Sequence, residues 1–241
     1  GKMKPHSLNE LIDSLPEAVP LFEKAYLDHD RLADAVRFYV NELFGDQGLI
    51  VVDADHKNLK HLFAPVIKKE LFENTSKELV KATYQRLDTA GYKNQAFSRE
   101  INVFYMENGL RERIVREGEQ FKVLNTDKVF SESEMIELIE KHPEHFSPNV
   151  IMRPLYQEVI LPNLAYVGGP AEIAYWLQLK DVFDHHEVFF PALMPRVFGL
   201  IVNKANEKKV QKLKLSGKQL FQSAHKLKEM YLQKHGENAL F

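Results

Sequence analysis

The amino-acid sequence predicts an α/β protein with a mostly parallel sheet, a small antiparallel insert and a helical arm at its C-terminal end. Three observations support this fold class. An apolar run suited to a buried parallel strand, residues 48–54, lies between two amphipathic helical stretches. Short segments of alternating polarity follow at residues 99–124. From Lys204 onward the pattern is helical and rich in lysine.

The composition is that of an ordinary globular protein. Of the 241 residues, 44% are hydrophobic and 27% are charged, and the net charge of −2 gives no reason to expect nucleic acid as a partner. Because there is no cysteine, disulfide bonds and thiolate metal sites are excluded, and any reacting thiol must belong to a substrate. With no candidate membrane span or signal-peptide core, we expect a cytoplasmic location and no membrane partner.

Four parts of the chain differ in pattern. We expect a first part of the α/β core, an antiparallel meander, a second part of the core and a helical arm, at residues 1–98, 99–130, 131–203 and 204–241.

The first part should contain helices on either side of the predicted strand 48–54. Asp30 is a candidate N-cap for the helix before this strand, and Asp55 for the helix after it. Asp53 and Asp55 also stand at the end of the strand, where α/β folds bind ligands, but capping is the simpler interpretation. A further helix is expected from Ser76 to about Thr89.

The meander is predicted by turn residues between alternating segments. Asn108-Gly109 is a strong hairpin signal, and Glu117-Gly118 is a second turn. These turns separate three expected strands, at residues 101–106, 110–116 and 120–124.

The second part of the core opens with Ser131 and Glu134, which have the spacing of a capping box before a helix to about Lys141. Further elements are then expected in the order helix, strand, helix, strand and strand, at residues 149–161, 163–168, 170–183, 187–190 and 192–202. The arm carries a narrow apolar stripe, which is typical of the start of a coiled coil, at Leu220, Ala224, Leu227 and Tyr231.

The segment VGGPAEIAYW has the form of a ligand site, because a strand leads through a glycine turn into a helix. The amide groups of Ala171 and Glu172 at that helix start could hold an anion. The alternative is a tight turn that packs a helix on a sheet. Upstream, Arg153 and Gln157 share one helix face, so the arginine could bind a carboxylate or phosphate or pair with a nearby acid.

Two groups of histidines resemble metal ligands only superficially. Asp184-His185-His186-Glu187 lacks the spacing of a known metal motif, and an exposed loop explains it better. His142 and His145 lie near a turn, where a plain loop is again the simpler interpretation. We therefore expect no metal site.

The segment 149–175, NVIMRPLYQEVILPNLAYVGGPAEIAY, resembles the signature block of the bacillithiol synthase family, in which NxxxRPLxQExxxPxLAxxxGPxEIxYW recurs. The stretches HPEHFSPN, MPRV at 194–197 and AGY at 90–92 match the family in position and type. The resemblance covers nearly the whole chain and corresponds to the middle portion of a longer protein.

This resemblance implies a Rossmann-like core, a coiled-coil arm and a homodimer in the full-length protein. It also implies a cysteine-adding ligase that binds an adenine nucleotide, ATP or ADP, and acts on glucosaminyl malate and cysteine. The resemblance further implies substrate-binding residues on the signature, while the catalytic residues stay unassigned: Asn149, Arg153, Gln157, Glu158, Gly168, Gly169, Pro170, Glu172 and Tyr175.

The start at Gly1 and the end at Phe241 indicate a fragment, which would lack part of the active site and most of the coiled coil. A fragment of this kind could be inactive by itself. The alternative to an enzyme is a nucleotide-binding scaffold that dimerises through its helical arm.

Overall fold

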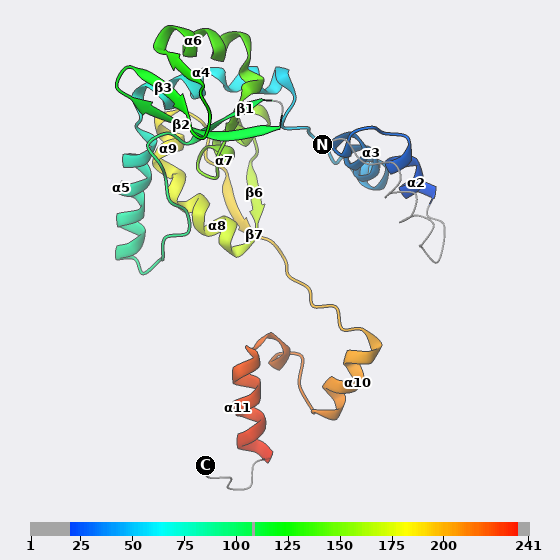
Figure 1. The fold of residues 1–241 in the computed structure, drawn as a ribbon. Helices are drawn as coiled ribbons and strands as arrows, with labels where there is room; N and C mark the ends of the chain where they lie inside the picture. The colour runs from blue at the N-terminus through cyan, green and yellow to red at the C-terminus, as the bar shows by residue number, and fades with distance from the viewer. Residues whose placement is uncertain (1–19, 108, 236–241) are drawn as a thin grey trace. The chain divides into compact units, whose positions relative to one another are not determined.

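The computed structural model describes residues 20–107 and 109–235, and its mixture of helices and strands confirms the α/β class (Figure 1). The chain divides into two compact units, Gly1–Arg196 and Val197–Phe241.

The main sheet of the first unit is antiparallel, so the prediction of a mostly parallel sheet is wrong. Its five strands lie in the order β4-β3-β2-β1-β5, and every neighbouring pair runs antiparallel. The strands are β1 (Val103–Glu107), β2 (Leu110–Glu117), β3 (Gln120–Val123), β4 (Val129–Ser131) and β5 (Phe146–Pro148).

The predicted meander is confirmed as β1, β2 and β3. Gly109 and Gly118 have φ angles of 85° and 63°. This left-handed conformation costs glycine little, and tight hairpin turns require it. The meander is larger than expected, because β4 and β5 extend the same sheet at its two edges.

A separate two-stranded sheet provides the one parallel pairing among the described residues. Strands β6 (Ala165–Gly168) and β7 (Ala192–Pro195) run parallel, and Gly168 lies opposite Pro195. The predicted strand 163–168 is therefore confirmed over residues 165–168. The predicted strand 187–190 does not form, and of 192–202 only the first four residues are strand.

Residues 48–54 do not form the buried strand that their apolar run predicts. Leu49, Ile50 and Val52 expose 46%, 69% and 38% of their surface. A strand needs a hydrogen-bonded neighbour, and no strand within residues 20–107 and 109–235 pairs with this segment.

Eight helices are described in the first unit. They are α2 (Pro20–Leu27), α3 (Leu32–Phe44), α4 (Lys57–Glu73), α5 (Ser76–Thr89), α6 (Glu132–Lys141), α7 (Met152–Ile160), α8 (Pro170–Trp176) and α9 (Lys180–His185). Single 3₁₀ turns are η1 (Gly45–Gln47), η2 (Pro143–His145) and η3 (Leu177–Leu179). The η3 turn divides the helix predicted over 170–183.

The helix starts show which capping predictions were right. The capping box of Ser131 and Glu134 is present at α6. Asp30 is not the cap of α3, because Arg31 precedes that helix without a side-chain cap. The cap of α4 is His56 rather than Asp55, and the Asp55 carboxylate instead pairs with Lys60 at 2.9 Å.

The core of the first unit lies between the antiparallel sheet and its helices. Helix α4 packs against α6, α7 and β1, and it contributes the buried residues Phe63, Ile67 and Leu71. Trp176, which has no exposed surface, anchors the later helices by stacking on Tyr166 with 4.1 Å between ring centroids. This packing fixes the signature segment on the core.

The second unit contains α10 (Lys204–Lys212), η4 (Gln219–Phe221) and α11 (Ala224–His235). From 197 to 233, the residues whose side chains are described include none that is buried. The helical pattern is thus present, but residues 213–223 interrupt it, so the structure does not show a coiled-coil arm.

Candidate functional site

The signature segment begins with a turn that Asn149 stabilises. Its Oδ1 accepts hydrogen bonds from the amides of Ile151 and Met152, at 2.8 and 3.2 Å, as α7 starts. Its Nδ2 donates to Asn102 Oδ1 at 2.9 Å, so Asn149 ties α7 to the loop before β1. Asn149 therefore positions the helix that carries Arg153.

Arg153 leaves the first turn of α7 and reaches α8. Its guanidinium donates to the hydroxyl of Tyr175 at 2.5 Å and to Gln157 Oε1 at 3.4 Å. Burial lowers the pKa of Arg153, but the hydroxyls of Tyr175 and Tyr166 outweigh this effect and the pKa is raised. Arg153 is therefore a fixed positive charge that faces two tyrosine hydroxyls.

Glu172 joins this group through Tyr166. Its carboxylate accepts from the amide of Gly169 at 2.8 Å and from the hydroxyl of Tyr166 at 3.3 Å, and Arg196 is 4.0 Å away. The Gly169 amide and then Tyr166 lower the pKa of Glu172. Because Glu172 occupies the Gly169 amide, that amide is not free for a bound anion.

The glycine turn between β6 and α8 is tightly packed. A Cβ on Gly168 would lie 2.7 Å from Cε1 of Tyr166 and 3.2 Å from Cδ1 of Ile173. Pro170 opens α8, where a missing N–H costs least. The turn therefore holds Tyr166 and Glu172 in place.

Glu158 has a local partner. It is 2% exposed, and its carboxylate accepts from the backbone amide of Asn163 at 2.8 Å and from the side chains of Asn163 and Gln157. These bonds close the turn between α7 and β6. In this structure Glu158 supports the segment rather than facing open space.

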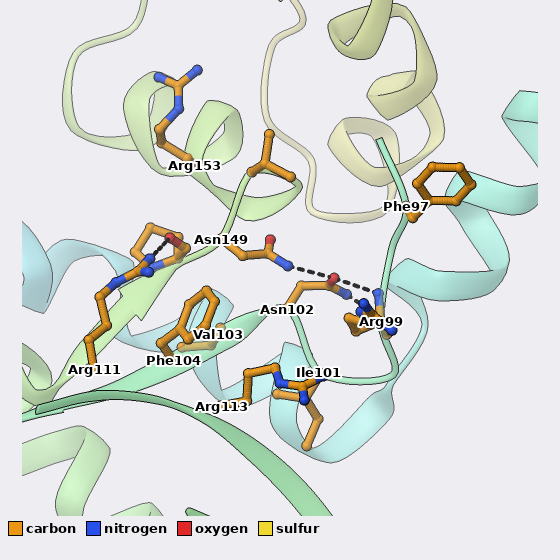
Figure 2. Close-up of a pocket in the computed structure, with 12 residues that line it drawn as sticks. Phe97, Arg99, Ile101, Asn102, Val103, Phe104, Arg111, Arg113, Asn149 and Arg153 are labelled. Atoms are coloured by element: carbon orange, nitrogen blue, oxygen red, sulfur yellow. Dashed lines mark hydrogen bonds between the residues drawn. The ribbon is translucent and has the colours of Figure 1, made fainter. Parts of the chain in front are cut away.

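Six of the nine predicted residues fall into two groups that share Arg153, whereas Glu158, Gly168 and Pro170 belong to neither group. The first group is the tyrosine network: Arg153, Gln157, Tyr166, Gly169, Glu172, Tyr175 and Arg196. Tyr166 and Arg196, which were not predicted, join this first group. The second is a hollow of about 640 Å³, of which Arg153 and Asn149 form part of the wall. In Figure 2 the guanidinium of Arg153 points away from Asn149 and Asn102.

The tyrosine network combines one fixed cation, one carboxylate and two hydroxyls, with a second cation nearby. Such a set can hold an anionic group at Arg153 and a protonated amine at Glu172. Sequence reasoning missed Tyr166 and Arg196. Both lie in segments that resemble the family, so the signal was present in LAYVGG and MPRV.

The histidines near 142–145 come closer together than expected. Ligand atoms of His142, Glu144 and His145 lie within 4.8 Å of one another. However, Glu144 is already paired, because the Lys57 ammonium donates to its Oε1 at 3.1 Å. This ion pair also joins the start of α4 to η2.

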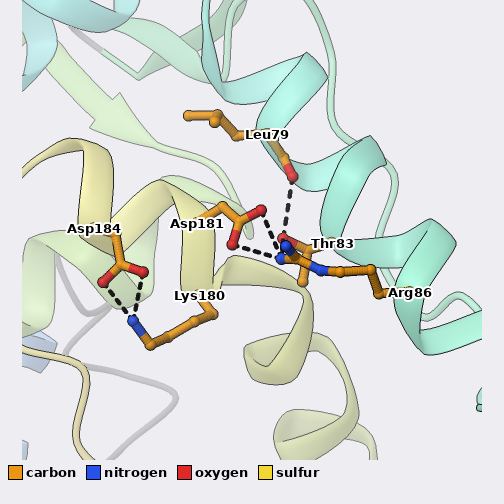
Figure 3. Close-up of polar contacts among 6 residues, drawn as sticks. All are labelled: Leu79, Thr83, Arg86, Lys180, Asp181 and Asp184. Carbon is orange, nitrogen blue, oxygen red and sulfur yellow. Dashed lines mark hydrogen bonds and ion pairs between the residues drawn. The ribbon is translucent and has the colours of Figure 1, made fainter.

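The segment 184–187 does not gather around a common point. Figure 3 shows Asp184 bound to Lys180 on its own helix, while the neighbouring Asp181 accepts two bonds from Arg86 of α5, each 2.6 Å long. His185 lies 3.1 Å from Thr75 Oγ1. These contacts join α9 to α5, which is a structural role.

Across the part of the chain that the structure describes, no helix combines the length and apolar character needed to cross a bilayer.

Comparison with known proteins identifies a family. Residues 7–197 match the model described as "Bacillithiol biosynthesis BshC, N-terminal Rossmann-like domain". This match covers most of the chain and includes the whole tyrosine network.

Curated relatives agree with this match, each named "Putative cysteine ligase BshC". A protein of Flavobacterium psychrophilum is 50% identical over 202 residues, which are 83% of this chain and 38% of the relative. A protein of Cytophaga hutchinsonii is 41% identical over 230 residues, 95% of this chain and 44% of the relative. One from Staphylococcus aureus strain Newman is 35% identical over 187 residues, 76% and 35% of the two chains. The chain thus spans about two fifths of the length of these relatives.

Proposed function

The chain belongs to the BshC family of bacillithiol biosynthesis, and on that premise we propose that it forms part of a ligase that joins cysteine to glucosaminyl malate. The observation that carries this proposal is the tyrosine network, in which Arg153 and Glu172 face the hydroxyls of Tyr175 and Tyr166. Apart from Arg196, the network lies inside the family's signature segment, and its charges suit the carboxylates and the amine of glucosaminyl malate.

The reaction forms an amide bond between the carboxyl carbon of cysteine and the amine of the sugar. The carboxyl group must first be activated, because a free carboxylate resists attack by an amine. We propose that ATP supplies the activating group. When the amine, in its neutral form, attacks the carboxyl carbon, the activating group leaves with one carboxyl oxygen and the nitrogen gives up a proton. The proposal of ATP rests on the family resemblance, since residues 20–107 and 109–235 contain no glycine-rich phosphate loop.

Each member of the network has a proposed role. Arg153 binds a carboxylate of the malate group through a charge-assisted hydrogen bond. Glu172 holds the amine of the sugar, and its lowered pKa keeps it ionised at neutral pH. Tyr175 and Tyr166 position these two side chains through their hydroxyls. Gln157 supports Arg153 from the next turn of α7.

The test is mass spectrometry on the natural protein that carries this sequence, incubated with glucosaminyl malate, cysteine and ATP. We expect the sugar malate to gain the mass of one cysteinyl residue, and the gain to require all three compounds. Release of ADP would indicate an acyl phosphate, and release of AMP an adenylate. If nucleotide binds but the sugar malate gains no mass, the ligase proposal fails and a nucleotide-binding scaffold explains the chain better.

The proposed homodimer is tested separately by sedimentation equilibrium of the same natural protein. A mass of two chains is expected over the concentration range of the assay. A monomer that still makes product would remove the dimer from the proposal without affecting the ligase.

A further inference from the structure

A cationic hollow lies beside the tyrosine network, on the antiparallel sheet (Figure 2). Its volume is about 640 Å³. It is lined by residues of the loop before β1, of strands β1, β2 and β5, and of the start of α7. Three of the lining residues are arginines outside the signature segment, namely Arg99, Arg111 and Arg113. Among residues 20–107 and 109–235, no aspartate or glutamate lines the hollow.

The backbone explains why the arginines share one side. Arg111 and Arg113 are two residues apart on β2, so their side chains leave the same face of the sheet. On β1, Phe104 lies opposite Arg113 in the register. Arg99 comes from the preceding loop, where its backbone amide donates to Asn102 Oδ1 at 2.9 Å.

The three guanidinium groups differ in what they contact. Arg111 donates to Ser147 Oγ at 3.3 Å and to the Pro148 carbonyl at 3.4 Å, and it lies 3.9 Å from the centre of the Phe104 ring. The guanidinium groups of Arg99 and Arg113 make no hydrogen bond or ion pair with any residue in 20–107 or 109–235. All the N–H donors of these two guanidinium groups are therefore available to a ligand.

Buried bonds hold the wall of the hollow in position. Asn102 has no exposed surface, and its backbone amide and Nδ2 both donate to Glu70 Oε1, at 2.8 and 2.9 Å. Ser76 donates to the other oxygen of Glu70 at 2.5 Å. Asn102 in turn accepts from Arg99 and Asn149. Because Glu70 fixes Asn102, both ends of the wall are in place before any ligand arrives.

We propose that this hollow binds a small molecule with at least two negative charges, and that Arg99 and Arg113 are its principal ligands. Guanidinium groups match the oxygens of phosphates and carboxylates, and like charges around one hollow are stabilised by an anion between them. Arg111 contributes charge from the edge. Phe104 and the 73% exposed Phe97 provide apolar surface for the uncharged part of the ligand.

This inference does not depend on the ligase activity. The principal ligands lie outside the tyrosine network, so anion binding can be measured on this chain without substrate turnover. The volume of the hollow suits a small molecule, and the net charge of −2 gives the whole chain no general attraction for polyanions.

The test is calorimetric titration of this chain at low salt with inorganic phosphate, pyrophosphate, malate and citrate. We expect saturable binding of at least one of these anions. Preference for pyrophosphate would indicate a phosphate-bearing ligand, and preference for citrate or malate a carboxylate ligand. Absence of saturable binding for all four would overturn the proposal.

The double variant Arg99→Gln/Arg113→Gln should weaken binding of the best anion at least about a hundredfold, because it removes two charge-assisted contacts and each contributes about tenfold or more. A matched control, Lys68→Gln/Lys81→Gln, removes the same charge from α4 and α5, where the nearest carboxylate oxygens are 3.9 Å away. The control should change affinity less than about threefold. Equal weakening in both variants would show diffuse attraction and contradict a site.

All four substituted side chains are exposed, so the variants should keep the far-UV circular dichroism of the parent chain. As a direct readout, NMR of the arginine Nε–Hε groups should show shifts for Arg99 and Arg113 on addition of the bound anion. Shifts that appear only at arginines outside the hollow would overturn the assignment.

Discussion

At the scale of single residues, Arg153 connects the signature segment to its surroundings. It belongs to the tyrosine network through Tyr175, and it also lines the cationic hollow. The resemblance pointed to Arg153, but its partner could not be derived from the sequence, because Tyr175 is 22 positions away and meets it only in the folded chain. The same holds for Arg99 and Arg113, which no sequence pattern singles out.

The network predicts a graded response to substitution. Arg153→Gln should reduce kcat/KM for glucosaminyl malate in the natural protein at least about tenfold, because it removes the charge that binds the malate carboxylate. Tyr175→Phe keeps that charge and removes only the contact that positions it, so a smaller loss is expected. Steady-state kinetics measures both.

Arg86→Gln is the control, because it breaks a comparable arginine contact with Asp181 away from the network. It should leave kcat/KM unchanged. If Arg153→Gln lowers the melting temperature strongly while kcat/KM stays the same, Arg153 is structural and the assignment is wrong.

Glu144 predicts a dependence of stability on pH. Burial raises the pKa of Glu144, but hydrogen bonds from its own backbone N–H, His142 and Lys57 outweigh burial and lower the pKa from 4.5 to about 2. The folded state therefore binds this proton less readily than the unfolded chain. Glu144 stabilises the fold above about pH 4.5, and this stabilisation is lost as the pH falls toward 2.

Glu144→Gln removes the titrating group and should flatten the decline in unfolding free energy between pH 4.5 and 2. Urea unfolding across this range measures the difference between the parent chain and the variant. Glu78→Gln, on an exposed side chain with a contact of only 3.9 Å to Lys81, is the control and should keep the parent slope. Identical slopes for all three proteins would contradict the role of Glu144.

At the scale of elements, sequence reasoning was right where local signals decide the structure. The meander follows from alternation and glycine turns, and α6 follows from its capping box. It was wrong for residues 48–54, because an apolar run specifies burial only if another element covers it. Ile50 is 69% exposed in this chain, although its pattern favours a buried strand.

The difference between an exposed and a buried apolar position can be measured by comparing two isoleucines. Ile50→Ala should change the unfolding free energy by less than about 0.5 kcal/mol, as is usual for exposed positions. Ile114→Ala, at a site on β2 that is only 2% exposed, should cost about 2 to 5 kcal/mol. Chemical denaturation of this chain gives both values. A comparable cost at Ile50 would mean that residues 48–54 are covered after all.

The turn between β6 and α8 allows a similar comparison of adjacent glycines. Gly168→Ala should destabilise the chain by about 1 to 3 kcal/mol, because the new Cβ meets Tyr166 at 2.7 Å and that ring is stacked on Trp176. The new Cβ of Gly169→Ala would meet the end of the Arg196 side chain at 2.8 Å and Glu172 Oε2 at 3.3 Å, and both are ends of flexible side chains that can move. Thermal unfolding should therefore rank Gly168→Ala as the more damaging, and the reverse order would contradict the packing of this turn.

At the scale of the whole molecule, the α/β class could be predicted, but the direction of the sheet could not. Alternation of helices and strands favoured a parallel sheet, whereas strand direction depends on pairing between distant segments. β5 pairs with β1 from more than forty positions away, while the one parallel pair joins β6 to β7. The arm was predicted from its charged helical pattern, and its interruption at residues 213–223 was missed.

The division into two units predicts that the first is stable without the second. All the core residues of the described chain lie before position 184, and none from 197 to 233 is buried. A chain that ends at Arg196 should therefore melt within about 3 °C of the whole chain, which corresponds to less than about 1 kcal/mol. Trp176 is the single tryptophan and has no exposed surface, so its fluorescence reports on the first unit in both proteins.

Met152→Ala in the whole chain is the contrasting variant, because it opens a core cavity and should lower the melting temperature clearly. If the shortened chain melts as early as Met152→Ala, residues 197–241 contribute to the core and the two units are not independent.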